Sequence, residues 1–266
     1  MSFEDKVEQL HRILLDYRRV AVAFSGGVDS SLLLKVALDT LGAGNVLGLF
    51  GRSCLLTEEE QQRAESWPVR HGFAEGLELT FVDIQPLFWK EFVCNSEDRC
   101  YLCKLRMYRC FTEEMEKRDI HVLLDGTNTD DLKDRRPGLR AIHELGVKTP
   151  FVEAGFDKQD VRMYSRQLQL DTWQSPSLSC LATRIPHGLE VTEDRLQKIA
   201  FWEAELTQMG FNGCRVRMVP VKEEAVYIQL QHNQFEQFLV QGMRVAVLRF
   251  FQKNGIAEIY LDITGR

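Results

Sequence analysis

Residues 20–31 read VAVAFSGGVDSS, an apolar run that stops at two glycines and resumes as a helix-forming stretch. The segment Val20–Phe24 has the composition of a buried strand. Gly26 and Gly27 let the chain turn sharply and allow backbone N–H groups to approach an anion closely. Asp29–Ser31 then open the helix, so that unpaired amides and the positive end of its dipole face the turn. The stretch therefore predicts a strand, a turn and a helix around a polyphosphate site.

The residues after the glycines narrow the chemistry of this turn. No lysine follows them, so the Walker-type loop of many kinases and GTPases is absent. The turn resembles the SGGxDS loop of the PP-loop ATP pyrophosphatases, with a plain Gly-Gly turn in an ordinary βα unit as the alternative. The resemblance implies that ATP gives an adenylate and pyrophosphate, with Mg²⁺ at Asp29. The residues that it assigns to the nucleotide are Ala23, Phe24, Ser25, Gly26, Gly27, Asp29, Ser30, Ser31 and Gly126.

The composition is that of a soluble globular protein. The chain has 266 residues, of which 44% are hydrophobic and 27% are charged. No segment approaches the ~20 consecutive apolar residues of a membrane span. The segment Met1–Tyr17 carries acidic residues early and apolar residues at helical spacing, unlike a signal peptide, so we expect a cytoplasmic protein. A formal net charge of −6 gives no sign of extended contact with nucleic acid, so we expect no nucleic-acid partner.

The order of the expected elements indicates an α/β fold. Strands that alternate with helices predict a doubly wound parallel sheet, whose ligands lie at the carboxyl ends of the strands. A capping box beginning at Thr57 opens one helix, and Pro68 ends or kinks it. Besides the first strand, the expected strands are Val46–Phe50, Leu77–Val82 and His121–Asp125.

From about Thr192 the pattern changes to a small α+β domain. We therefore expect a PP-loop domain over residues 1–188 and a small domain for substrate binding or oligomerisation over residues 189–266. The elements expected in the small domain are helices at Glu193–Met209 and from Phe235 to about Gln252, and strands at Cys214–Val219, Ala225–Gln231 and Ala257–Asp262.

Seven cysteines in a chain of this kind point to metal or thiol chemistry for some of them. Cys100 and Cys103 form a CxxC whose two sulfurs can reach one metal centre, particularly from a loop or the first turn of a helix. Redox dithiols and half zinc sites have the same spacing. Cys180 lies far along the chain, and a small buried side chain is the simplest interpretation of it.

Six ordered motifs resemble the LarE sulfur transferases over almost the whole chain. They are SGGVDSS at 25–31, DGTNTDD at 125–131, RRPGLRA at 135–141, FDKQDVR at 156–162, SCLATRIPHG at 179–188 and RVR at 215–217. The resemblance implies an adenine nucleotide alpha hydrolase-like fold. It also implies a reaction in which ATP adenylates a carboxylate of a pyridinium dicarboxylate mononucleotide and sulfur displaces AMP. That substrate is a precursor of the nickel-pincer nucleotide cofactor.

By the same resemblance, Cys100, Cys103 and Cys180 match the family members in which three cysteines hold a four-iron four-sulfur cluster. Three thiolates on such a cluster leave one iron without a protein ligand, and an open iron can bind and deliver sulfide. The alternatives are a sacrificial or persulfide-carrying Cys180, and zinc or plain thiols. The terminal sulfur comes from free sulfide or from a persulfide donor. Because the family includes hexamers, we also expect a homo-oligomer.

Four further residues are candidates for the site. Arg184 lies four residues after Cys180, and we expect it to hold the transferred carboxylate or the adenylate phosphate. Arg215 and Arg217 alternate on a strand and share one face, and the resemblance implies that they bind the substrate phosphate. Glu203 matches an acidic position near the substrate, with a solvated helix glutamate as the alternative.

Two departures from the family pattern are visible in the small domain. Gln229 stands at a position that is often acidic, which weakens the case for a cation contact there. The chain also stops at Arg266, where relatives continue through an arginine-containing tail, and the role of that arginine is not carried over.

Two other functions fit the same motifs. A PP-loop tRNA thiolase also combines cysteines with adenylation, but the acidic net charge and the lack of an appended basic domain argue against it. A module that binds nucleotide or metal without chemistry would keep the loop. Conversion of ATP to AMP separates the module from the enzyme, and salt-sensitive tRNA binding would indicate the thiolase.

Overall fold

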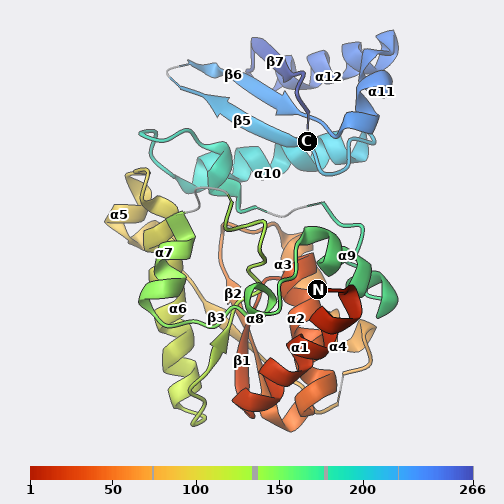
Figure 1. The fold of residues 1–266 in the computed structure, drawn as a ribbon. Coiled ribbons are helices and arrows are strands. Elements are labelled where there is room, and N and C mark those ends of the chain that lie inside the picture. The colour runs from red at the N-terminus through yellow and green to blue at the C-terminus, as the bar shows by residue number, and fades with distance from the viewer. Residues whose placement is uncertain (74, 134–136, 177–178, 221, 266) are drawn as a thin grey trace. The chain divides into compact units, whose positions relative to one another are not determined.

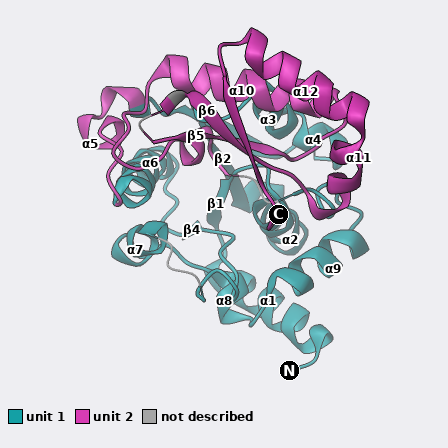
Figure 2. Ribbon diagram, turned by 90° about the horizontal axis from the view of Figure 1, so that it is seen from above, with its two compact units in different colours: residues 1–86, 98–178 teal, residues 87–97, 179–266 magenta. Residues whose placement is uncertain are grey.

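The computed structural model describes residues 1–73, 75–133, 137–176, 179–220 and 222–265. The chain divides into two compact units, which Figure 2 shows in different colours. Unit 1 consists of residues 1–86 and 98–178, and unit 2 consists of residues 87–97 and 179–266. The motif at 135–141 begins outside the described residues.

Unit 1 is built on a four-stranded parallel sheet in the order β3-β2-β1-β4. Its strands are β1 (Val20–Phe24), β2 (Val46–Arg52), β3 (Glu78–Asp83) and β4 (Leu123–Leu124). Its helices are α1 (Phe3–Tyr17), α2 (Val28–Leu41), α3 (Glu58–Glu65), α4 (Trp67–Arg70), α6 (Arg99–Glu116), α7 (Pro137–Glu144), α8 (Pro150–Glu153) and α9 (Lys158–Gln167), with a 3-10 turn η1 at Ala43–Asn45.

Helices cover both faces of this sheet because the side chains of β1 alternate between them. Val20, Val22 and Phe24 pack into a core with α1, α2 and α9. Ala21 belongs to a second core with residues of α6 and α7. Figure 1 shows α1 and α2 on one side of β1 and α6 on the other. The predicted doubly wound α/β fold is confirmed.

The predicted helix cap and helix end in unit 1 are found in the structure, but the last strand is shorter than predicted. Thr57 caps α3 with both hydrogen bonds of a capping box, and the helix ends before Pro68, which lies in the first turn of α4. The strand expected at His121–Asp125 contains only two residues. Beyond Leu124 the chain leaves β1, because the Asp125 N–H donates to the Lys148 carbonyl at 2.9 Å.

Unit 2 is an α+β structure around the sheet β5-β6-β7, in which β5 and β6 are antiparallel and β6 and β7 are parallel. The core lies between this sheet and two helices, with Trp202 of α10 against Phe251 of α12. Its elements are α5 (Lys90–Val93), η3 (Leu181–Arg184), α10 (Glu193–Gln208), β5 (Arg215–Val219), β6 (Lys222–Gln229), η4 (His232–Gln234), α11 (Phe235–Leu239), α12 (Gln241–Lys253) and β7 (Glu258–Asp262), and the 3-10 turn η2 (Pro86–Phe88) spans the boundary between the units.

One expected helix of unit 2 is two helices in the structure. The stretch from Phe235 to about Gln252 is interrupted at Val240, whose ψ of 125° is extended. The break separates α11 from α12. A β-branched residue is tolerated in an extended conformation, so the sequence periodicity alone did not reveal the interruption.

The segment 87–97 joins unit 2 through the buried side chain of Asn95. Its amide donates to the carbonyls of Pro186 at 2.8 Å and Leu189 at 2.6 Å. The Asn95 carbonyl in turn accepts from the Gly188 N–H at 3.1 Å, and the Val191 N–H donates to the Val93 carbonyl at 3.0 Å. These bonds cross about ninety positions of sequence, which explains why the structural division differs from the one expected at residue 188.

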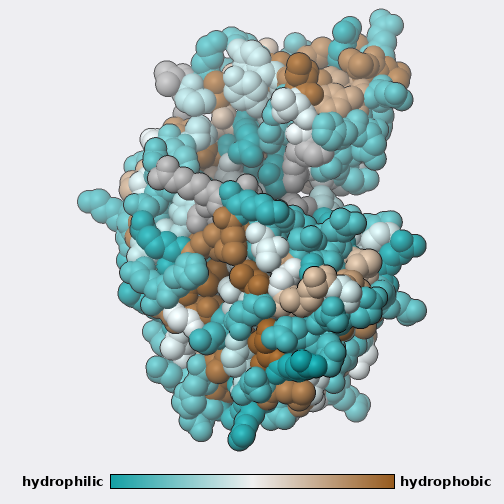
Figure 3. Space-filling view, viewed as in Figure 1, coloured by the Kyte–Doolittle hydropathy of each residue, from teal (hydrophilic) through white to brown (hydrophobic). Residues whose placement is uncertain are grey.

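Hydrophilic side chains cover much of the face that Figure 3 draws. On the face of unit 1 seen in Figure 3, they surround smaller groups of apolar ones. In the described part of the chain, every helix lacks the combination of length and apolar composition that crossing a membrane requires.

We predict that Asn95→Ala lowers the free energy of unfolding by about 2 kcal/mol, because it leaves the half-buried carbonyls of Pro186 and Leu189 without their donor. The backbone of Asn95 has φ of 56°, which alanine adopts less readily and which adds to the loss. Urea denaturation followed by circular dichroism measures the change. The exposed Asn212→Ala is the control, and equal stability of the two variants would contradict the role of Asn95.

Candidate functional site

The turn between β1 and α2 is shaped by two glycines and by its own serines. Gly26 has φ of 75°, and the extended Gly27 caps α2 without a side chain. The Ser25 N–H donates to Ser30 Oγ at 3.1 Å, and the Ser30 hydroxyl donates to the Gly27 carbonyl at 3.3 Å. The first bond of the helix runs from the Ser31 N–H to the Gly27 carbonyl, so the amides before it point away from the helix. The turn is a preformed cradle for an anion.

Gly126 places a second loop directly against this cradle. A Cβ atom at this position would lie 3.1 Å from the Asp29 carbonyl carbon and 3.1 Å from the Ser30 nitrogen. Both contacts are with backbone, which has little freedom to move. A side chain at this position would therefore push the loop after β4 and the start of α2 apart by a few tenths of an ångström.

The Asp29 carboxylate faces the same loop. Asn128 donates from Nδ2 to Asp29 Oδ1 at 2.9 Å, a contact that was not predicted although Asn128 lies within the DGTNTDD motif. Burial raises the pKa of Asp29, and the nearby Asp131 raises it further. A bound Mg²⁺ would relieve the cost of this buried negative charge and would suit carboxylate oxygens.

A partly buried ion pair connects the end of β4 to α6. Lys104 Nζ lies 3.0 Å from Asp125 Oδ2, and the same carboxylate accepts from the Thr127 N–H at 2.8 Å and from the Tyr108 hydroxyl. Burial opposes ionisation of Asp125, but the Lys104 ammonium and the hydroxyl donors outweigh it and lower the pKa. Lys104, the residue next to the CxxC, therefore forms its ion pair with Asp125, the residue before Gly126.

The two cysteines of the CxxC lie near the start of α6 (Arg99–Glu116), one of the two settings, loop or helix, that the spacing left open. Cys100 and Cys103 are three residues apart on this helix, so both thiols lie on one face, and both are half-buried. Cys180 belongs to unit 2. Among the described residues there is no group of three or more His, Cys, Asp or Glu side chains arranged to hold a metal ion. Within unit 1 the pair supplies two sulfur ligands.

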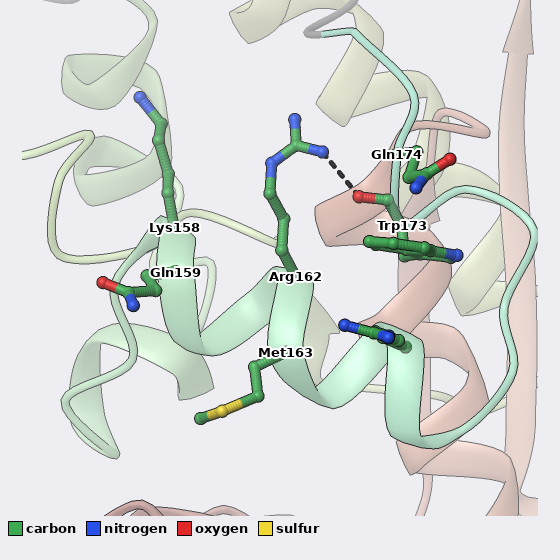
Figure 4. A pocket seen from close by; sticks show the side chains of 7 residues that line it. Lys158, Gln159, Arg162, Met163, Trp173 and Gln174 are labelled. Atoms are coloured by element: carbon green, nitrogen blue, oxygen red, sulfur yellow. Dashed lines mark hydrogen bonds between the residues drawn. The ribbon is translucent and has the colours of Figure 1, made fainter.

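A groove of about 720 Å³ in unit 1 runs between α9 and the segment at Trp173 (Figure 4). Lys158, Arg162 and Arg166 line it at intervals of four residues on α9. Arg162 donates to the carbonyls of Trp173 at 2.6 Å and Ser175 at 3.0 Å, and the Arg166 guanidinium lies 5.0 Å from the Trp173 ring. These two arginines attach the segment at 173–175 to α9. Lys158 Nζ lies 3.4 Å from Asp131, near the loop that contacts Asp29.

In unit 2, the segment that carries Cys180 is held by one arginine. Arg184 Nη1 donates to the Ser179 carbonyl at 2.6 Å and to the Cys180 carbonyl at 3.1 Å. Its other nitrogens form a bidentate pair with Glu203, with Nε–Oε1 and Nη2–Oε2 both at 2.9 Å. Arg184 is only 7% exposed. Its donors are largely directed to the protein itself.

Glu203 does not lie on a solvated face of α10. Besides Arg184, it accepts from the Val216 N–H at 2.8 Å, and its side chain is 13% exposed. The carboxylate therefore links α10, η3 and β5. Periodicity placed Glu203 on the polar side of the helix correctly but did not show that this side faces other polar groups.

Arg215 and Arg217 flank the buried Val216 on β5 and share one face, as predicted from strand alternation. Arg217 donates from Nε to Gln229 Oε1 at 2.8 Å and from Nη1 to the Thr183 carbonyl at 2.6 Å. Burial lowers the pKa of Arg217, and the nearby Arg184 lowers it further. The two arginines and Gln229 thus lie together in unit 2.

We predict that Asp29→Asn raises the free energy of unfolding at neutral pH. The folded state raises the pKa of Asp29 above its ordinary value of 3.8, so the wild type loses stability as the pH rises through and above that value. Asparagine removes this loss and keeps the acceptor for Asn128. Urea denaturation at pH 7 and near pH 4 measures the gain, which should shrink at the lower pH. The exposed Asp16→Asn is the control, and an unchanged or lower stability at pH 7 would refute the prediction.

Comparison with known proteins gives relatives over most of the chain. It is 33% identical over 253 residues to the pyridinium-3,5-bisthiocarboxylic acid mononucleotide synthase of Lactiplantibacillus plantarum, covering 95% of this chain and 88% of that protein. An uncharacterised protein of Synechocystis is 33% identical over 262 residues, covering 98% of this chain and 95% of that protein. No protein-family model matches the chain.

A more distant likeness covers only part of the chain. A component of the glutamine-hydrolysing GMP synthase of Methanosphaerula palustris is 29% identical over 145 residues, or 54% of this chain and 45% of that protein. It belongs to the PP-loop superfamily, in agreement with the sheet and the cradle described above. With the fold and the length of the first match taken together, the chain belongs to the LarE family of PP-loop proteins.

Proposed function

We propose that the protein is an ATP-dependent sulfur transferase that converts a carboxylate of a pyridinium dicarboxylate mononucleotide into a thiocarboxylate. The observation that carries the proposal is the cradle at Ser25–Ser31 with Gly126 against it, in a chain of the LarE family. The name of the L. plantarum relative, a synthase of the bisthiocarboxylic acid mononucleotide, supports the choice of substrate.

The first step that we propose is adenylation. The amides before Ser31 would hold the β- and γ-phosphates, and Asp29 would bind Mg²⁺ shared with them. A carboxylate oxygen of the substrate attacks the α-phosphorus and the bond to pyrophosphate breaks. The product is a mixed anhydride with AMP, in which the substrate oxygen bridges carbon and phosphorus. Preorganised amides favour this step because they hold the charge of the departing pyrophosphate.

The second step replaces oxygen with sulfur. A sulfur nucleophile attacks the acyl carbon, the carbon–oxygen bond breaks, and AMP leaves with the original carboxylate oxygen. We propose that Cys100, Cys103 and Cys180 hold an iron–sulfur cluster that supplies this sulfur. The CxxC pair on one face of α6 supports two of the ligands, and the site in unit 2 supports a defined place for Cys180.

The arginines of unit 2 receive different roles in this proposal. Arg217 and Arg215 bind the phosphate of the mononucleotide from one face of β5. For Arg184 we propose a positioning role instead of the ligand contact expected from the sequence. Its donors are directed to Glu203 and to the carbonyls on either side of the Cys180 N–H, so it fixes the segment that carries the thiol.

We predict that Gly126→Ala lowers kcat/KM for pyrophosphate release at least about tenfold, or 1.4 kcal/mol, because its Cβ would displace the first turn of α2. Release of AMP and pyrophosphate from ATP with the pyridinium substrate measures the effect. Gly44→Ala is the matched control, since a Cβ there meets nothing within 4 Å. Equal rates in the two variants would contradict the assignment of the cradle, and ATP binding without AMP formation would favour a binding module.

We predict that the anaerobically purified protein contains iron and acid-labile sulfide, at about four of each per chain. Cys100→Ser, Cys103→Ser and Cys180→Ser should each lose both, whereas the exposed Cys94→Ser should keep them. A colourless protein with one zinc ion would refute the cluster. A chain that loses the sulfur of Cys180 after a single turnover would replace the cluster with a sacrificial cysteine.

A further inference from the structure

Three neighbouring strands of unit 2 carry a chain of polar side chains that ends on Arg217. Gln229 of β6 is paired with Asp262 of β7 in the ladder, and Gln229 Nε2 donates to Asp262 Oδ2 at 2.7 Å. Gln229 Oε1 accepts from Arg217 Nε at 2.8 Å. A carboxylate on the last strand therefore reaches a guanidinium on β5 through one amide.

The order of donors and acceptors allows only one orientation of this amide. An ionised carboxylate only accepts hydrogen bonds and a guanidinium only donates them, whereas an amide does both. With the Gln229 side chain reversed, its oxygen would face Asp262 and its NH₂ group would face the Arg217 N–H. Both contacts would then be repulsive. The hydrogen bond to Asp262 thus orients the Gln229 amide so that its oxygen, an acceptor, faces Arg217.

A second contact completes the hold on the guanidinium. Arg217 Nη1 donates to the Thr183 carbonyl at 2.6 Å, so Nε and Nη1 are both engaged. Two fixed nitrogens define the plane of the group and the direction of the remaining nitrogen, Nη2. An arginine held in this way loses little rotational freedom when it binds a phosphate.

We propose that Asp262 is a positioning residue for Arg217, acting through Gln229, so that the last strand of the chain orients the guanidinium that binds the substrate phosphate. The inference rests on the proposed function for the role of Arg217. Gln229 itself has no negative charge, whereas Asp262 on the neighbouring strand does. The Gln229 amide connects the Asp262 carboxylate to Arg217 by one hydrogen bond on each side.

This relay predicts a rescue. Asp262→Ala leaves the Gln229 amide free to rotate, so that its oxygen is no longer held toward Arg217. In the double variant Asp262→Ala with Gln229→Glu, a carboxylate meets Arg217 directly and the relay is unnecessary. Gln229→Glu alone places two carboxylates at the distance of the present hydrogen bond, 2.7 Å, and should not reproduce the benefit of the pair.

Two readouts separate positioning from folding and from the proposed function. The first is solvent exchange of the Arg217 Nε–H in ¹⁵N NMR of the full chain, assigned with Arg217→Lys. The second is the division between KM and kcat with a pyridinium carboxylate mononucleotide. Because the exchange measurement needs no turnover, failure of the second readout in the wild type would overturn the proposed function and leave the orientation of Arg217 testable.

We expect Asp262→Ala to speed exchange and to raise KM about tenfold each, with kcat within about twofold, because one charge-assisted contact is lost. The double variant should restore both values. Glu258→Ala is the matched control, since Glu258 is a carboxylate on the same face of β7 that pairs with Lys222. Unchanged exchange in Asp262→Ala, or a double variant no better than that single variant, would overturn the proposal. Asp262→Asn, which keeps the side-chain shape, repeats the test if alanine weakens the turn at Thr264.

Discussion

The close approach of the Gly126 backbone to the first turn of α2 is the constraint on which the proposed nucleotide site depends. A Cβ would lie 3.1 Å from backbone atoms of Asp29 and Ser30, so any larger residue would have to push that backbone back by a few tenths of an ångström. In the same loop, Asn128 donates to Asp29, and Asp125 forms an ion pair with Lys104 of α6. The loop after β4 therefore contacts both the start of α2 and the CxxC helix within unit 1.

Unit 2 contains two positive charges close together, because Arg184 lies near enough to Arg217 to contribute to its lowered pKa. Arg184 is matched by a direct bidentate carboxylate, whereas Arg217 reaches its carboxylate through an amide. The first arrangement commits the guanidinium to the protein. The second holds its orientation with less direct neutralisation, which suits the phosphate-binding role proposed for Arg217.

Much of unit 1 could be predicted from sequence because its signals are local. The run at 20–31 and the capping box at Thr57 each specify structure within a few residues, and each is found as predicted. The fold class followed from the alternation of strands and helices. The family was recognisable because several short motifs occur in a fixed order.

What the sequence did not reveal depends on contacts between distant residues. Asn95 assigns its segment to unit 2 through carbonyls some ninety positions later, and no periodicity encodes that choice. Glu203 lay on the predicted polar side of α10, but a polar side can face water or an arginine. Gln229 looked like a lost charge until its pairing with Asp262 placed one on the next strand.

The central claim is that a substrate carboxylate is adenylated before sulfur replaces its oxygen. The most direct measurement uses a pyridinium dicarboxylate mononucleotide labelled with ¹⁸O in its carboxylates, incubated with ATP, Mg²⁺ and sulfide. Mass spectrometry of the AMP then follows the bridging oxygen. The account predicts one ¹⁸O atom in AMP for each thiocarboxylate formed, whereas unlabelled AMP, or thiocarboxylate without AMP, would contradict it.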